Sequence, residues 1–182
     1  LLPGEMYGRR FADTHEFIGW YAAKIVSTVG GWLRETGVDV PVYGNGWSPL
    51  YQDFCQLMDV ADLAGTDIYP KPFFGGGQGG ADNWRYNIDI LKQQEADVTD
   101  GNVWSAEYQS GLYPISQVGY LPPQHYRFVD LTMMARGLKG WNWYMLVSRD
   151  NWYHCPINEW GRTNEFYPVH CGIVEMTNAV EP

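Results

Sequence analysis

Residues 63–70 read Leu63-Ala64-Gly65-Thr66-Asp67-Ile68-Tyr69-Pro70, a short apolar segment that ends at a proline. Such a segment predicts a strand. Three further segments have strand character, at 38–43, 102–108 and 140–147. The first of them is apolar and β-branched without alternation, which is typical of a strand buried on both faces.

Helical patterns occupy the gaps between these strands. Apolar residues recur with the helical period over 14–36, where Asp13 or Thr14 is the expected N-cap. Further helices are expected at 50–62, 82–94, 122–136 and 168–179. Helices that alternate with buried strands predict an α/β fold with a parallel sheet and helices outside it. A doubly wound sheet and a (β/α)8 TIM barrel both fit, and four strands are half of such a barrel.

Composition narrows the class of protein. The 182 residues suffice for one core, so residues 1–182 are treated as a single domain. A net charge of -9 without a Lys/Arg cluster argues against nucleic acid, and no run of about 18 apolar residues predicts a membrane span. The chain does not begin with Met and lacks a signal peptide, so we interpret it as processed or as a piece of a longer protein. Few lysines and an acidic surface favour an extracellular or periplasmic location.

Three cysteines form no disulfide framework. Cys155 and Cys171 each follow a histidine, but neighbouring ligands rarely converge on one ion, so no metal site is expected. The two cysteines form either a disulfide or two buried free thiols. No dinucleotide, phosphate-loop or nucleophile-elbow motif is present, and no cofactor is expected.

Polar side chains follow the predicted strands at their carboxyl ends, where parallel α/β sheets carry their functional residues. Glu107 lies there between aromatic residues, and a carboxylate in such a place is costly unless it is hydrogen bonded. Glu107 is either a functional group or the partner in an ion pair or helix cap. Asn45 and Tyr69 end other strands and are expected to converge on it. The Asn-Glu pairs at 158–159 and 164–165 follow the last strand and are interpreted as loop residues.

Five segments in a fixed order resemble a known family. They are Val40-Pro41-Val42-Tyr43-Gly44-Asn45-Gly46, Gly65-Thr66-Asp67-Ile68-Tyr69-Pro70, Ala106-Glu107-Tyr108-Gln109-Ser110-Gly111, Asn142-Trp143-Tyr144-Met145 and Asp150-Asn151-Trp152. Together they resemble the C-terminal half of the catalytic barrel of family 35 glycoside hydrolases, which are β-galactosidases, and more distantly that of family 42. Both families belong to the retaining clan A. The resemblance covers residues 38–152 and implies that this chain holds strands five to eight of a (β/α)8 barrel with their flanking helices.

The resemblance implies a role for each matching residue. Glu107 matches the strand-seven nucleophile, and Tyr69 matches the strand-six tyrosine that hydrogen bonds to it. Asn45 matches a polar residue after strand five. Substrate-facing positions after strand eight correspond to Tyr144, Asn151 and Trp152.

The second carboxyl of such an enzyme departs from the family pattern here. The family acid/base is a glutamate that follows an asparagine after strand four, and the aligned position holds Met6, with Glu5 one residue earlier. Either Glu5 is a shifted acid/base or the acid/base lies on the missing half of the barrel, which we favour.

Three functions therefore stay open: an exo-β-galactosidase, a catalytically inactive relative that binds carbohydrate in the same cleft, and an unrelated doubly wound domain. The first two functions predict a carbohydrate as the ligand. They also predict that this chain is accompanied by the missing half-barrel or by further domains of the same protein. Aromatic residues form 16% of the chain, and their faces suit stacking against sugars. The residues expected around Glu107 are Trp47, Tyr69, Trp104, Tyr144 and Trp152, whereas Trp20 and Trp32 are assigned to helix packing.

Overall fold

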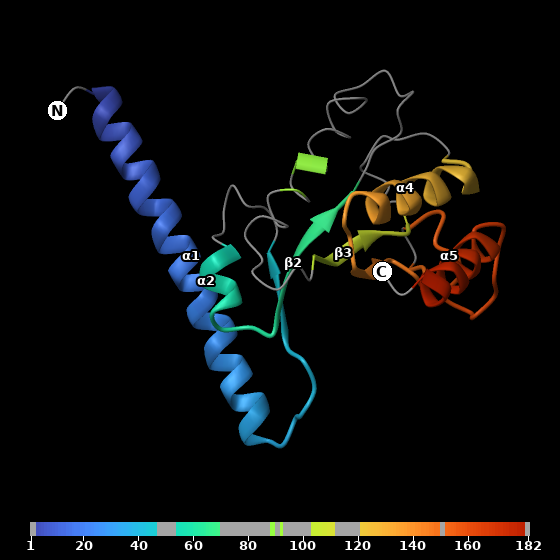
Figure 1. Cartoon of the computed structure of the whole chain (residues 1–182), viewed down its shortest axis with the longest axis horizontal. Helices are drawn as coiled ribbons and strands as arrows, with labels where there is room; N and C mark the ends of the chain where they lie inside the picture. Colours follow the sequence, from blue (N-terminus) through green and yellow to red (C-terminus); the bar gives the residue numbers. More distant parts are fainter. Residues whose placement is uncertain are drawn as a thin grey trace.

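The computed structural model describes residues 3–46, 54–69, 88–89, 92, 103–111, 121–149 and 152–180; the side chains of 3–7, 46, 54, 55 and 64 fall outside this description. The helices and strands follow one another along the chain as Figure 1 shows. They are α1 (Pro3–Glu35), β1 (Tyr43–Gly46), α2 (Phe54–Met58), β2 (Leu63–Ile68), β3 (Trp104–Gln109), α4 (Pro123–Ala135), β4 (Gly140–Tyr144) and α5 (Tyr167–Val180). The expected α/β class is confirmed.

The four strands form one curled parallel sheet in the order β1-β2-β3-β4. Strands that are consecutive along the described chain are therefore neighbours in space. A doubly wound sheet reverses its strand order at a switch point, whereas a barrel keeps the sequential order. The described sheet thus has the topology of part of a (β/α)8 barrel.

Helices α2 and α4 cover the same face of this sheet. Leu57 of α2 lies so close to Gly44 that a Cβ there would come within 2.8 Å of the leucine Cδ1. Ile68 pairs with Tyr108, and both pack in the main core cluster with Val129, Met133 and Leu138. By the alternation of side chains along paired strands, Gly44, Ile68 and Tyr108 point to one side. The opposite face is the inner face of the curled sheet.

Helix α5 completes the covering of the far strand. His170 lies against Trp143 of β4, with 4.8 Å between ring centroids. Tyr126 of α4 contacts Phe166 and His170 from the other side. The two C-terminal helices and β4 therefore share one aromatic core.

The first strand begins later than expected. Residues 38–42 are not a strand, because the Arg34 guanidinium donates hydrogen bonds to the carbonyl oxygens of Val38 and Val40 at 2.9 and 2.7 Å. Asp62 accepts the Val42 amide hydrogen and pairs with the same arginine. With these groups bound in this way, residues 38–42 form no strand, although the Val42 carbonyl oxygen accepts the amide hydrogens of Asp62 and Leu63. The prediction for 38–43 was wrong at all but its last residue.

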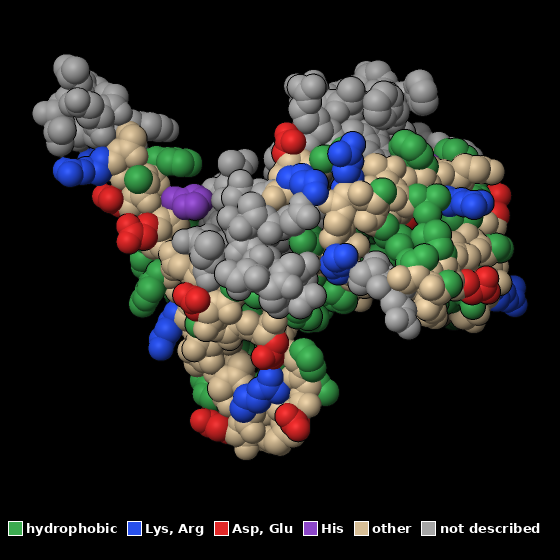
Figure 2. Space-filling view, viewed as in Figure 1, with side chains coloured by type: hydrophobic (Ala, Val, Ile, Leu, Met, Phe, Trp, Pro, Cys, Tyr) green, Lys and Arg blue, Asp and Glu red, His purple; other side chains and the backbone are tan. Residues whose placement is uncertain are grey.

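Helix α1 is longer than predicted and its apolar side is exposed. Thr14 is not an N-cap, since its hydroxyl donates to the Arg10 carbonyl inside the helix. Trp20 and Trp32 are 54% and 61% exposed, so their assignment to helix packing was wrong for the described chain. Figure 2 shows hydrophobic side chains along this helix at the surface. The periodicity predicted the helix correctly. Within the described chain, however, α1 packs onto α2 along one narrow stripe that includes Val26, which contacts Leu57.

The described residues also bear on cysteine pairing, membrane-spanning helices and metal sites. Cys155 and Cys171 are free thiols, the first of them buried, so the disulfide alternative does not hold. No described helix is long and apolar enough to cross a membrane. Within the same residues no group of His, Cys, Asp or Glu is arranged to hold a metal ion.

Candidate active site

Glu107 reaches the inner face of the sheet through a β-bulge in β3. Thr66 pairs with Ser105, whereas the next residue of β2, Asp67, pairs with Glu107. The extra residue of β3 is Ala106, and the register toward β4 shifts at the same place. The Ser105 hydroxyl fixes the bulge through contacts with the carbonyl oxygens of Thr66 at 2.9 Å and Glu107 at 3.1 Å. A bulge redirects the side chains that follow it, and here it turns the carboxylate inward.

Tyr69 holds the carboxyl group of Glu107. It directly follows β2, and its hydroxyl donates to Glu107 Oε2 at 2.6 Å. Burial raises the pKa of the Tyr69 hydroxyl, and the hydrogen bond to Glu107 raises it further. The hydroxyl therefore keeps its proton and acts as a donor. This donor fixes the orientation of the Glu107 carboxyl group.

Asp67 also belongs to the candidate site, although no sequence pattern pointed to it. It lies opposite Glu107 in the neighbouring strand, and a hydrogen bond joins the two carboxyl groups. Burial and the negative charge of Glu107 raise the pKa of Asp67 to about 7. The available signal was the spacing of Asp67 and Tyr69, because residues two apart on a strand share one face.

Two amide side chains flank the carboxyl pair. Asn45 of β1 hydrogen bonds to Asp67 and lowers its pKa against the effect of burial. Asn142 of β4 donates to the carbonyl of Ala106 at 3.3 Å and so holds the bulge from the other side. Asn45 thus lies at the expected site, although its partner is Asp67.

An aromatic wall begins at Tyr69. The Tyr69 and Tyr144 rings meet edge to face with 6.5 Å between centroids, and Tyr144 meets Trp152 in the same way at 5.3 Å. These three residues follow or end two strands that are separated by β3. The structure therefore brings two of the three predicted substrate-facing residues, Tyr144 and Trp152, into one row with Tyr69, which contacts Glu107.

Trp104 lies elsewhere than expected. It is the first residue of β3, and its indole crosses Gly65 and Gly140, where any Cβ would come within 2.5 and 2.6 Å of the ring. Its ring also contacts Tyr43 at 5.9 Å between centroids. The tryptophan thus fills the amino-terminal end of the inner face, below the carboxyl pair and not beside it.

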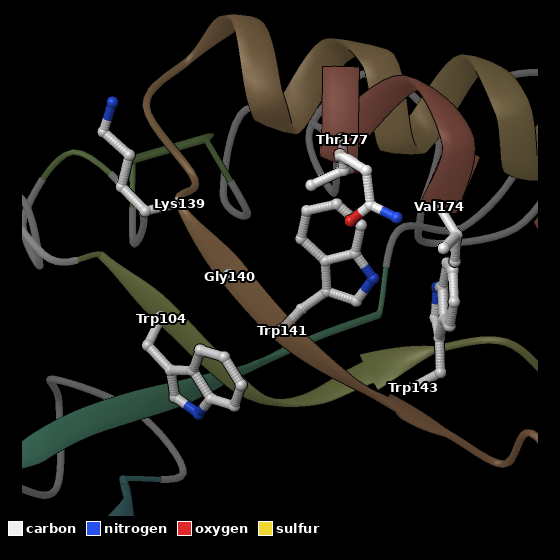
Figure 3. A pocket seen from close by; sticks show the side chains of 8 residues that line it. Trp104, Lys139, Gly140, Trp141, Trp143, Val174 and Thr177 are labelled. Carbon is white, nitrogen blue, oxygen red and sulfur yellow. The ribbon is translucent and has the colours of Figure 1, made fainter. Parts of the chain in front are cut away.

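A pocket of about 250 Å³ opens next to Trp104 at the edge of β4. Figure 3 shows Trp104 on one side of the β4 ribbon and Trp141 on the other, where the indole points toward Thr177 of α5. Lys139 and Gly140 form its other border. The pocket belongs to the free edge of the strand and lies at the end opposite Glu107.

Other predicted site residues are not brought to Glu107. Glu5 lies in the first turns of α1, which project away from the sheet in Figure 1. Trp47 and Asn151 lie outside the described residues. Within the described chain, the site therefore consists of Glu107, Asp67 and the side chains that surround them.

The two Asn-Glu pairs are loop residues, as predicted. Asn158 accepts the backbone amide hydrogens of Trp160 and Arg162 in a turn. Asn164 accepts the Phe166 amide hydrogen just before α5. Both asparagines organise the chain between β4 and α5, away from the carboxyl pair.

The structure is similar to a solved polyextremophilic β-galactosidase from the Antarctic haloarchaeon Halorubrum lacusprofundi, with a TM-score of 0.66 and 16% sequence identity. The match covers 91% of this chain and 27% of that chain, so this chain spans about a quarter of the length of the solved protein. No protein-family model and no curated protein matches the sequence. The comparison establishes a fold like that of this glycoside hydrolase.

Proposed function

We propose that this chain is part of a retaining glycoside hydrolase that removes terminal β-galactosyl or related β-glycosyl groups, with Glu107 as its nucleophile. The observation that carries the proposal is the 2.6 Å hydrogen bond from Tyr69 to Glu107 Oε2 on the inner face of the sheet. The aromatic wall beside this carboxylate and the likeness to a β-galactosidase fold support the same function.

In this proposal, β1 to β4 are strands five to eight of a clan A barrel related to family 35 or 42. Glu107 then lies on strand seven and Tyr69 after strand six. The inner-face position of both residues supports this assignment, because the sites of (β/α)8 enzymes lie at the carboxyl ends of the strands.

The reaction follows from the position of Glu107. Its carboxylate forms a bond to the anomeric carbon while the bond to the leaving oxygen breaks, and the product is a glycosyl ester of Glu107. A second carboxyl group protonates the leaving oxygen and then takes a proton from the water that hydrolyses the ester. The rings of Tyr144 and Trp152 offer apolar faces to the sugar during both steps.

The acid/base belongs to another part of the protein. The two carboxyl groups of a retaining enzyme are about 5–5.5 Å apart, whereas Asp67 is hydrogen bonded to Glu107 and therefore lies too close. Glu5 starts a helix that projects away from the sheet. We assign the acid/base to the half of the barrel that contains strands one to four, in preference to Glu5.

The free edges of the sheet support a folded unit with more strands. Among the described strands, β1 and β4 each pair on one side only, and unpaired edges attract further strands. The pocket at the β4 edge in Figure 3 is lined by Trp104, Trp141 and α5 residues that a neighbouring strand and helix would cover. The same barrel half would supply the acid/base.

A carbohydrate-binding protein without catalysis is the second candidate. It is favoured by one observation: among the described residues, the carboxyl group paired with Glu107 is that of its direct strand neighbour Asp67, and not one set apart as the acid/base of a retaining enzyme. Such a protein would use the aromatic wall of Tyr69, Tyr144 and Trp152 to bind the sugar.

Covalent labelling tests the proposal. The full-length protein is treated with a dinitrophenyl β-galactoside that carries fluorine at carbon 2, which slows hydrolysis of the glycosyl ester. Mass spectrometry of the peptides should find the sugar on Glu107, and E107Q should take up none. E165Q, a substitution in the loop before α5, is the matched control and should be labelled at the wild-type rate.

Labelling at another residue would overturn the role of Glu107. Absence of labelling together with measurable galactose binding by calorimetry would support the binding protein instead. Absence of both would overturn both candidates.

A further inference from the structure

The carboxyl pair of Asp67 and Glu107 has a feature that the glycosidase mechanism leaves unused. The two residues are direct neighbours on β2 and β3, and the pairing exists only because the bulge at Ala106 brings Glu107 into register with Asp67. A retaining enzyme needs one nucleophile, and this face carries two adjoining carboxyl groups. Two carboxylates so close together repel each other unless a proton lies between them.

The surroundings of Asp67 show where that proton belongs. The Oδ1 atom of Asp67 is buried and has no hydrogen-bond partner among the described residues. A buried carboxylate oxygen without a donor is costly. Glu107, by contrast, already accepts a hydrogen bond from Tyr69 at 2.6 Å.

We propose that Asp67 is a positioning residue that carries the single proton of the pair and donates it in a hydrogen bond to Glu107, which holds the nucleophile in its attacking orientation. This inference rests on the proposed function of Glu107. It adds a donor from β2 to the one that Tyr69 supplies, so that the nucleophile is held from two positions on the same strand.

The charges around Asp67 agree with this assignment. The titratable groups that face it within the described chain are Glu107 from β3 and Tyr69 from the end of β2, and β1 contributes the neutral amide of Asn45. Burial first, and then the charge of Glu107, raise the pKa of Asp67 to about 7. Asp67 is thus protonated in weakly acidic solution and loses its proton as the pH rises through that value.

The proton stays on Asp67 throughout the reaction. When Glu107 bonds to the anomeric carbon its negative charge disappears, and when water cleaves the ester the carboxylate returns to the same hydrogen bond. Above pH 7 Asp67 becomes an anion, the hydrogen bond is lost, and repulsion turns the Glu107 carboxylate away from the sugar. The rate of attack should therefore fall on the alkaline side.

The rate of Glu107 labelling by the fluorinated dinitrophenyl galactoside measures this attack in the full-length protein. Dinitrophenolate leaves without protonation, so the rate does not depend on the acid/base carboxyl. In the wild type the rate should fall with an apparent pKa near 7. D67N keeps a donor that cannot ionise, and its rate should stay level through that range, whereas D67A should lose about 10- to 100-fold at about pH 6.

Asp130 provides the matched control. It is a buried aspartate of α4 whose pKa burial also raises to about 7, but it lies on the outer side of the sheet. D130N should leave the alkaline fall in place. An unchanged fall in D67N, or an equal loss of the fall in D130N, would overturn the role of Asp67.

A second measurement separates this inference from the proposed function. Infrared difference spectra of full-length D130N, which lacks the other described aspartate with a pKa near 7, should show a protonated carboxylic acid that titrates near pH 7 and is absent in the double variant D67N/D130N. If that band is present while Glu107 takes up no sugar, the shared proton stands and the glycosidase function fails. If Glu107 is labelled but D67N/D130N retains the band, the function stands and the Asp67 assignment fails.

Discussion

Two regions of this chain differ in how far they bury their apolar side chains. Behind the site, β2, β3 and α4 bury Ile68, Tyr108 and Met133 completely. Helix α1 leaves large side chains such as Phe11, Trp20 and Trp32 more than half exposed. The carboxyl pair is therefore supported by a complete core on one side of the sheet, whereas α1 presents a surface that takes no part in holding it. The comparison predicts that substitutions in the two regions have very different effects.

The largest effect is expected at Glu107 itself. E107Q removes the nucleophile and should lower kcat of the full-length protein by about 10⁴-fold or more. The substitution keeps size and lies in front of the core, so the unfolding midpoint should change little. Activity assays with a nitrophenyl β-galactoside measure the first quantity and thermal unfolding the second. Retained activity in E107Q would contradict the role of Glu107 as the nucleophile.

The next effect concerns the pH dependence of stability. Burial penalises the charge of Asp130 and raises its pKa in the folded chain from the ordinary 3.8 to about 7. As the pH rises the unfolded chain loses this proton first, so the free energy of unfolding should fall by about 4 kcal/mol between about pH 4 and pH 8. In urea titrations D130N should remove the part of the fall that is due to Asp130, whereas Asp67, whose pKa is also raised to about 7, should keep its own part. An equally steep fall in D130N would show that the buried aspartate is not its cause.

A pair of truncations compares the two regions directly. M133A empties a fully buried position of α4 and should lower the free energy of unfolding by about 3 kcal/mol. W32A removes a side chain that is 61% exposed and should change it by less than about 0.5 kcal/mol. Denaturant unfolding of both variants measures the difference. A large loss in W32A would mean that α1 is covered in the folded protein.

The smallest effects are expected at two glycines, with opposite signs. A Cβ at Gly65 would lie 2.5 Å from Trp104 and 2.9 Å from the backbone nitrogen of Ala106, so G65A should cost about 1–3 kcal/mol. Nothing lies within 4 Å of a Cβ at Gly31 of α1, and G31A should stabilise the helix by about 0.5–1 kcal/mol. Unfolding midpoints test both signs, and a neutral G65A would contradict the position of Trp104.

Much of the fold was predictable because it is local. Helical periodicity and apolar runs gave the order of elements, and strand ends with polar residues pointed to Glu107, Tyr69 and Tyr144. What escaped was set by contacts between distant residues. Arg34 and Asp62 determine where β1 begins, and neither pattern nor propensity reveals an ion pair across 28 positions.

The site itself was predicted in part for the same reason. Alternation alone would place Glu107 and Trp104 on opposite faces, and the bulge at Ala106 that joins them leaves no local trace in the sequence. Trp104 was expected beside the carboxylate because it was counted with the carboxyl end of a strand at 102–108, whereas β3 begins at Trp104 itself. Asp67 was overlooked because its importance comes from its partner on the next strand.

The bulge in β3 absorbs one residue of the strand and keeps Glu107 on the inner face. Trp104 and Glu107 are separated by an odd number of positions, and they share a face only because one residue is extra. Replacing Ala106 by another small residue preserves that count. Deleting it would leave Trp104 and Glu107 two positions apart, and regular alternation would still place both side chains on the inner face. A descendant of this sequence that lost this one codon could therefore keep its carboxylate on the inner face with a straight strand in place of the bulged one.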